Sequence, residues 1–437
     1  MTTNFLHGVE VISLTEGIRP IQTVRSAVIG LIGTAPNATA GKFPLNEPVL
    51  VSGSRAMAAD LGTGGTLPNA VDAIFKQIGA TVIVVRVAEG ADEAATLANV
   101  VGASATQTGV HAFLKAESNL GLSPKILVAP GFTHQCTLTT GSEVANVVVA
   151  ELASIASGTT GVCDRLRAIV VADGPDTTSS DAQAYADLHA NKRVYVVDPQ
   201  VKVSRGSSVV NERASAYVAG VIAKSDAERG FWFSPSNRII QGIVGTSRAI
   251  GFFLGDENAE ANIMNENDVA TIIRENGFRL WGNHVTNTDQ QFQFLSVVRI
   301  MDMVNESVMR AHLWAVDRCI TRTYLEDVRQ SVDSYLRSLE VRGAILGHRV
   351  YVDPDANTAT NIANGNVTFD FEITPVYPAE RVTFRSILTN GFIQNLITDN
   401  NQADNSLLNT DSQNAPGNEG QAQGDGAGNG NQDGTYV

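Results

Sequence analysis

Near its end the chain reads Val367-Thr368-Phe369-Asp370-Phe371-Glu372-Ile373, and after Pro375 and Pro378 it continues Val382-Thr383-Phe384-Arg385. Apolar and polar residues alternate in both parts, which is typical of strands with one buried face. The prolines lack amide donors and therefore interrupt sheet pairing at a corner. Because an isolated pair of strands is marginal in water, the stretch 367–388 is expected to need further strands.

The composition favours a large globular protein with a role in assembly. The chain has 437 residues, of which 43% are hydrophobic and 17% are charged. This length suits two or three domains, and the low charged fraction suggests that surface is hidden in contacts with other subunits. The net charge of −14 argues against nucleic acid as a partner, since such binding requires Lys and Arg.

The cysteines and the N-terminus indicate a reducing compartment and no membrane insertion. Cys136, Cys163 and Cys319 are far apart and fit neither a disulfide framework nor a CxxC metal site. The first residues show no basic region followed by an apolar core. No apolar run approaches the ~20 residues that span a bilayer. We expect a protein made and folded in cytoplasm.

Apolar runs and amphipathic segments alternate over residues 26–223, and this order predicts an α/β fold with a mostly parallel sheet. The expected strands are 26–33, 49–51, 81–87, 125–129, 167–172 and 194–197. The expected helices between and after them begin near Ser54 and Leu67 and cover 143–155, 179–189 and 211–223.

The C-terminal third changes character. Apolar residues recur at helical spacing over 294–315 and again over 325–339, which predicts two long amphipathic helices. The segment 342–352 then runs into a strand. Residues 399–437 are polar, acidic and without Lys or Arg, so they cannot bury enough apolar surface to fold alone.

Motifs for catalysis are incomplete. The segment Gly33 to Phe43 differs from a P-loop in its glycine spacing and ends in Phe instead of Ser or Thr. The Gly-rich turn 62–66 precedes a helix, where a simple helix-entry turn is the favoured interpretation over a phosphate site. The histidines show no ligand spacing, and His312 is interpreted as a satisfied or surface residue. We therefore predict no enzyme, no catalytic residue, no cofactor and no metal.

The order of several short motifs resembles the sheath subunits of contractile phage tails and R-type bacteriocins. The motifs are Gly8-Val-Glu-Val11, Ala27 to Pro36, Leu280-Trp-Gly282, Ser296 to Asp302, Arg342 to Gly347, Tyr351-Val-Asp353, Gly365-Asn366 and Pro375 to Glu380. Each is weak alone, but their order extends over about 390 residues. His284 departs from the Arg that often follows Trp-Gly in this family, and the polar tail is longer than usual.

The resemblance implies a fold of two parts. An inner α+β domain is built from both chain ends around a small β-sheet that neighbouring subunits augment, and an outer α/β domain is inserted between them. The implied segments are an N-terminal arm 1–24, an N-terminal α/β segment 25–100, an outer domain 101–285, an inner C-terminal domain 286–388, a C-terminal arm 389–398 and the tail 399–437.

The resemblance also implies the function and the residues that carry it. Subunits form hexameric rings that stack around a tail tube and contract to drive the tube through a cell envelope. The intersubunit strands would use Val9, Val11, Ile18, Val367, Phe369, Phe371, Ile373, Val382, Phe384, Leu388, Phe392 and Ile393. A different interpretation makes the first 24 residues an edge strand of their own domain. Tube-facing candidates are Arg318, Arg322, Arg329, Arg337 and Arg342, and a solvated helix face paired with Glu326, Asp327 and Glu340 is an equally good interpretation.

The expected partners are further copies of the chain, the tail tube protein, and baseplate and tail terminator proteins. The expected location is the virion tail, after assembly in the host bacterial cytoplasm. Two alternatives stay open at this point. One is the sheath of a bacteriocin or other phage-derived injection system, and the other, from a different class, is an α/β nucleotide-binding enzyme.

Overall fold

The computed structural model describes residues 21–154, 160–390 and 392–393. Its largest feature is a sheet in the order β2-β3-β1-β4-β5-β6-β11-β12-β9. In this order the strands are Pro48–Ser52, Thr81–Val87, Val28–Thr34, Ile126–Val128, Ile169–Asp173, Val194–Val197, Val269–Arg274, Phe278–Trp281 and Arg238–Ile239. The strands from β3 to β11 pair in parallel, and β2, β12 and β9 pair antiparallel at the two edges.

The sheet is buried on both faces, which explains its continuous apolar strands. All seven residues of β1 are buried, and β3 is the predicted strand 81–87. Helices α2 (Leu67–Gln77) and α8 (Ser215–Glu228) contribute to the core on one face. The core on the other face takes residues from α3 (Glu93–Val101), α5 (Val147–Ala153), α6 (Val162–Leu166), α7 (Ser179–Leu188) and α9 (Glu260–Glu266). The predicted α/β class with a mostly parallel sheet is confirmed.

Smaller elements complete this part of the chain. A second sheet has the order β10-β7-β8, formed by Gly245–Thr246, Val201–Arg205 and Ser208–Glu212. It replaces the start of the helix expected over 211–223, because Val209 and Val210 extend a hairpin and α8 begins after it. Two short helices are α1 (Arg55–Ala59) and α4 (Ala116–Leu120). Strands from before and after residue 100 share the large sheet, and the division near this residue remains a prediction.

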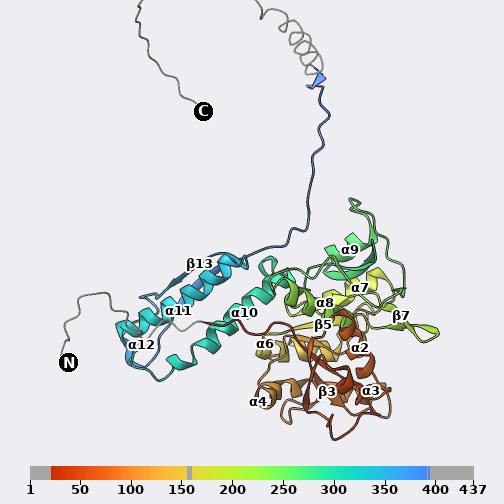
Figure 1. Ribbon diagram of the computed structural model, residues 1–437, viewed down its shortest axis with the longest axis horizontal. Coiled ribbons are helices and arrows are strands. Elements are labelled where there is room, and N and C mark those ends of the chain that lie inside the picture. Colours follow the sequence, from red (N-terminus) through yellow and green to blue (C-terminus); the bar gives the residue numbers. More distant parts are fainter. Residues whose placement is uncertain (1–20, 155–159, 391, 394–437) are drawn as a thin grey trace, which may run out of the picture. The chain divides into compact units, whose positions relative to one another are not determined.

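The C-terminal third forms a helical part with a small sheet. It contains α10 (Leu295–Ala311), α11 (Arg322–Val341), α12 (Ala359–Ala363) and the antiparallel pair β13 (Ile345–Tyr351) and β14 (Asp370–Pro375) (Figure 1). Its core also takes Phe231 and Trp232 from the chain that follows α8. The two predicted amphipathic helices are present as α10 and α11.

The first described residues pack on this same helical part. Ile21 and Val24 are partly buried against its core. The Thr23 hydroxyl lies 3.2 Å from the Tyr335 hydroxyl, and the Val24 amide donates to Ser307 Oγ at 3.1 Å. Residues near both chain ends therefore build one small core around a short sheet.

The expected pairing within 367–388 is corrected by the structure. The strand β14 covers 370–375 and pairs with β13, so its partner precedes it in the sequence. Arg349 and Glu372 form a cross-strand ion pair at 2.7 Å, which supports this register. Residues 379–390 form neither helix nor strand, so the expected strand around Val382 and Phe384 is not formed in the single chain.

Residues 379–437 make a separate unit. Val382, Phe384, Leu388, Phe392 and Ile393 belong to its described part. Val9, Val11 and Ile18, the end of the C-terminal arm and the tail 399–437 lie outside the described residues.

Candidate functional site

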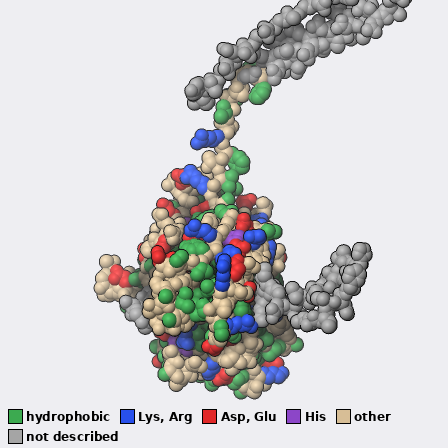
Figure 2. Space-filling model, turned by 90° about the vertical axis from the view of Figure 1, so that its left-hand side faces the viewer, with side chains coloured by type: hydrophobic (Ala, Val, Ile, Leu, Met, Phe, Trp, Pro, Cys, Tyr) green, Lys and Arg blue, Asp and Glu red, His purple; other side chains and the backbone are tan. Residues whose placement is uncertain are grey.

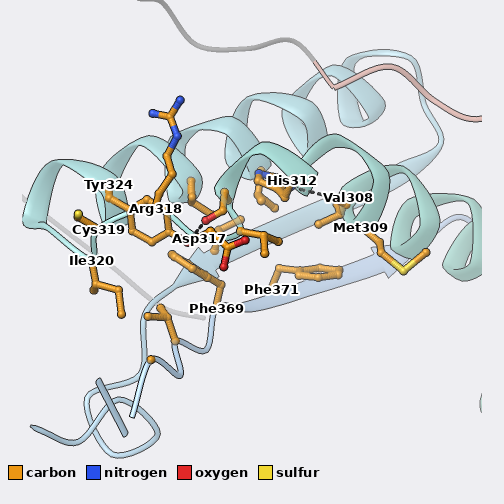
Figure 3. Close-up of a pocket in the computed structure, with 17 residues that line it drawn as sticks. Val308, Met309, His312, Asp317, Arg318, Cys319, Ile320, Tyr324, Phe369 and Phe371 are labelled. Atoms are coloured by element: carbon orange, nitrogen blue, oxygen red, sulfur yellow. Dashed lines mark hydrogen bonds between the residues drawn. The ribbon is translucent and has the colours of Figure 1, made fainter. Parts of the chain in front are cut away.

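An apolar groove of about 670 Å³ opens between the C-terminal end of α10, the face of α11 and the start of β14 (Figure 3). We call it the α10–α11 groove. Its lining residues are Val308, Met309, His312, Ala315, Val316, Asp317, Arg318, Cys319, Ile320, Tyr324, Val328, Val332, Val350, Gly365, Val367, Phe369 and Phe371.

The strand side of the groove comes from the alternation visible in the sequence. Val367, Phe369 and Phe371 are alternate residues, and all three line the groove. Phe369 and Phe371 lie opposite the helices in Figure 3. Further along the strand, Ile373 packs against the core of the helical part. The alternation thus predicts the shared face, while the intersubunit role of these residues stays a prediction.

The helix side is shaped by the connection between α10 and α11. Thr321 Oγ1 accepts the Tyr324 amide at 3.1 Å and caps α11. The Tyr324 hydroxyl donates to the Ala315 carbonyl at 3.3 Å. The Tyr324 ring stands 6.5 Å, centroid to centroid, from the Phe369 ring. Tyr324 therefore links the connection to the strand side and holds one end of the groove.

Apolar side chains in and beside the groove are also exposed. Met309, Leu313 and Val316 are 59%, 76% and 62% exposed. Figure 2 looks at the end of the molecule where α11 and α12 lie, and hydrophobic side chains gather there among charged ones. Large exposed apolar patches mark interaction sites. This surface is suited to an apolar polypeptide segment.

His312 adds one polar feature to the groove. Its Nδ1 donates to the Val308 carbonyl at 2.7 Å, and its Nε2 is buried without a hydrogen-bond partner in the described part of the chain. The free Nε2 can accept a hydrogen bond from a hydroxyl or amide donor. The sequence interpretation of His312 as a satisfied or surface residue misses this, because the orientation of the ring depends on the fold.

The small sheet beside the groove has open edges. It contains β13 and β14 alone among the described residues, so each strand has one edge with no described strand beside it. Unpaired strand edges present amide and carbonyl groups that pair readily with another chain. The groove and these edges together can accept an extended apolar segment.

The structure places the five arginines singled out from the sequence around α11. Arg329 and Arg337 bond to Glu326 and Asp333 at 2.7 and 2.9 Å, both on the same helix. Arg318 lies over the Trp314 ring and Arg342 over the Trp232 ring, at 5.0 and 5.1 Å from the centroids. Arg322 is the first residue of α11. Pairing with Glu326 agrees with the alternative of a solvated helix face, and contact with a tube stays a prediction.

The carboxyl end of the parallel sheet is where α/β enzymes place their sites. Here Asp173, at the end of β5, accepts the Ser215 amide at 2.8 Å and the Ser215 hydroxyl at 2.7 Å. Burial raises the pKa of the Asp173 carboxyl. Asp198 directly follows the neighbouring strand β6 and forms an ion pair with Arg248. Asp173 thus satisfies the start of α8, and Asp198 is satisfied by Arg248. Both carboxyl groups have a structural role at this edge of the sheet.

His134, beside this edge, is expected to make the fold sensitive to acid. Burial and the nearby charge of Arg213 lower the pKa of its imidazole from 6.5 to about 4. The unfolded chain protonates this imidazole at a higher pH than the folded chain does. The free energy of unfolding is therefore unaffected by this group above about pH 6.5 and decreases as the pH falls towards 4. The free energy of unfolding in urea should fall more steeply over this window in the natural chain than in His134→Phe. Equal slopes would contradict the prediction, and equal slopes at pH 7–8 provide the control.

In the described ranges, no group of three or more His, Cys, Asp or Glu side chains could hold a metal ion. No helix there combines the length and the apolarity that crossing a bilayer requires.

Family models for tail sheath proteins match most of the chain. The "phage tail sheath protein central domain" matches residues 103–286, the "phage tail sheath C-terminal domain" matches 287–389, and the "tail sheath protein Gp18 domain III N-terminal region" matches 26–87.

Similar proteins and structures agree with these matches. A prophage major tail sheath protein of Pseudomonas aeruginosa strain UCBPP-PA14 is 38% identical over 90% of this chain and 99% of that protein. The tail sheath protein of Escherichia phage P2 is 32% identical over 91% of this chain and 98% of that protein. The helical sheath of the anti-feeding prophage in its contracted state is similar in fold, with a TM-score of 0.65, 20% identity and coverage of 89% of this chain and all of that one.

The chain belongs to the family of phage tail sheath proteins. This membership makes it a structural tail protein, and not an enzyme.

Proposed function

We propose that the chain is the repeating subunit of a contractile tail sheath. Copies form hexameric rings that stack helically around the tail tube, and the stack shortens to drive the tube through the target cell envelope. The observation that carries this proposal is the pair β13–β14, which lies directly beside an apolar groove and whose outer edges have no strand beside them among the described residues.

Strands from neighbouring copies complete the small sheet. Main-chain hydrogen bonds give such an added strand its affinity, and alternate side chains give it specificity. The apolar residues Val9, Val11 and Ile18 form one candidate strand from one neighbour, and Leu388, Phe392 and Ile393 contribute from another. Val367, Phe369 and Phe371 offer the receiving face. Each copy then gives two segments, one from each chain end, and receives two.

Contraction requires neither nucleotide nor metal. A transition between two packings of the same subunits proceeds when the second packing has the lower free energy. Donated strands keep subunits attached while they rotate, because the connecting segments bend and the main-chain bonds persist.

The tube contact is assigned to the start of α11 and the connection before it. In Figure 3 the Arg318 side chain points away from the groove, and Arg322 follows closely in sequence. Arg329 and Arg337 are already paired with acidic neighbours, so they contribute less charge. Exposed ion pairs are worth about 0–1 kcal/mol each, which suits a contact that must release along the whole sheath.

The further partners are the baseplate and tail terminator proteins at the two ends of the sheath. The chain is a component of the virion tail, and it assembles in the cytoplasm of the host bacterium. The surroundings of its gene distinguish a phage from a bacteriocin, since capsid genes accompany the first and are missing from the second.

Electron microscopy of the purified full chain tests the function. Hollow, striated tubes are the expected result, with or without tube protein inside. Small uniform oligomers that bind nucleotide would contradict a sheath and support the α/β enzyme alternative. A tube that forms without added nucleotide would exclude that alternative.

A further inference from the structure

One side of α10 carries charged residues where a buried helix usually presents apolar ones. Arg299, Asp302, Glu306 and Arg310 follow one another at spacings of three, four and four residues, so they line one side of the helix. The residues Ile300, Met303 and Val304 belong to the core shared with α11. The charged stripe faces a different part of the molecule, the part that contains the large sheet.

Each residue of the stripe meets an opposite charge from that part. The pairs are Arg299 with Asp226 of α8, Asp302 with Arg193 before β6, Glu306 with Lys125 before β4, and Arg310 with Glu117 of α4. In the first three pairs no side chain is more than 8% exposed. The fourth pair is partly exposed at the end of the stripe.

The remaining donors of these groups are also used. Lys125 Nζ donates to the Leu166 carbonyl at 2.6 Å, and Arg193 Nε donates to Asp164 at 3.0 Å. Arg299 Nη1 donates to Asp226 Oδ1 at 2.7 Å, and its Nη2 donates to the Ser26 carbonyl at 3.2 Å. A buried ion pair is often no more stabilising than apolar residues of similar size, although removal of one partner is costly. Stability alone therefore does not explain three such pairs in a row.

The order of the charges supplies an explanation. Along α10 the signs are plus, minus, minus, plus, and along the facing partners they are minus, plus, plus, minus. A slip of α10 by one helical turn would bring Arg299 to Arg193 and Glu306 to Glu117. A slip in the other direction would bring Asp302 to Asp226 and Arg310 to Lys125. Each slip creates two like-charge contacts, so one register satisfies all four pairs.

We propose that this stripe is a register lock, a charge pattern that fixes how the helical part sits on the sheet part. Leu295 and Val298 at the start of α10 join the core of the sheet, but apolar contacts tolerate sliding because they are not directional. The ion pairs favour one position of α10 over positions that are shifted by one helical turn. A subunit locked in this way transmits a displacement of its helical part to its sheet part without internal slippage.

Paired apolar replacements test the lock. The single variant Lys125→Met should raise the ratio of unfolded to folded chain on the order of ten to a hundred fold, because the buried Glu306 then keeps only the partly exposed Arg310 as its partner. Lys125→Met with Glu306→Leu should recover most of that loss. The double variant should nevertheless fix the register less sharply, because each slip then creates one like-charge contact instead of two.

Spin labels measure the register. Cysteines at Ser180 on α7 and Val341 on α11 are labelled in a chain with Cys136→Ser and Cys319→Ser, and the labelled chain is mixed with excess unlabelled chain. The distance distribution should be one narrow peak with the natural pairs and broader or double in the paired apolar variant. A distribution as narrow as that of the natural chain would overturn the proposal and assign the register to apolar packing.

A second test variant and a control variant complete the experiment. Glu306→Gln keeps the size of the side chain and an oxygen that can accept from Lys125, and its peak should broaden as well. An unchanged peak in Glu306→Gln would also count against the lock. Lys42→Met removes one partner of an exposed pair with Asp60 and should change neither the peak nor the unfolding ratio.

Discussion

Removal of residues 1–20 is expected to abolish tube formation and to leave a folded subunit. The described structure begins with Ile21 and Val24 already packed on the helical part, so the core keeps its contacts when the preceding residues are deleted. The deletion removes Val9, Val11 and Ile18, which we propose complete the small sheet of a neighbour. Electron microscopy measures tubes, and circular dichroism with urea unfolding measures the fold.

The controls for this deletion separate a lost strand from general damage. A chain in which Val9, Val11 and Ile18 are replaced by Asp keeps its length and should also fail to polymerise, since the apolar side of the strand is gone. Deletion of residues 410–437 removes polar tail instead and should leave tubes intact. Tubes formed by the chain that lacks residues 1–20 would refute strand donation by this arm.

The second large effect is expected from Phe369→Asp. Phe369 is half-buried and lines the α10–α11 groove beside Tyr324. A carboxylate there would be desolvated when an apolar segment fills the groove, and burial of an unpaired charge is costly. In the single chain the same carboxylate remains in contact with water. We therefore expect a loss of tubes with a change in the free energy of unfolding of about 1 kcal/mol or less.

A matched substitution controls for added charge. Val209→Asp places a carboxylate at an apolar residue of β8 that is 61% exposed, away from the groove. It should leave both the fold and tube formation unchanged. If Phe369→Asp still formed tubes at the same protein concentration, the groove would have no part in assembly.

The local elements of this protein are readable in its sequence because their causes are local. The run Thr81–Val87 is apolar and β-branched, and the structure has a strand with those bounds. The alternation at Val367, Phe369 and Phe371 predicts that these residues share a face, and they do. Helical periodicity likewise predicts α10 and α11. In each case the repeat of the backbone decides which side chains lie together.

The partner of β14 could not be read in this way. The sequence interpretation pairs 367–373 with the alternating residues after Pro378, because those are next along the chain. The structure pairs β14 with β13, a strand that packs on α11. Strand pairing depends on which surfaces tertiary packing brings together, and the periodicity of one segment contains no information on this.

Sequence by itself determined the α/β class, the two long helices, the apolar face of β14 and, through its motifs, the family. Tertiary structure decided that β13 and β14, among the described strands, leave open edges beside a groove. It likewise decided that the Nε2 of His312, a lining residue of that groove, is buried without a hydrogen-bond partner in the described part of the chain. It also decided that Lys125 meets Glu306, and Arg193 meets Asp302. These charges are far apart along the chain, and they become partners because folding places α10 at the amino ends of β4 and β6, where buried charges require opposite charges.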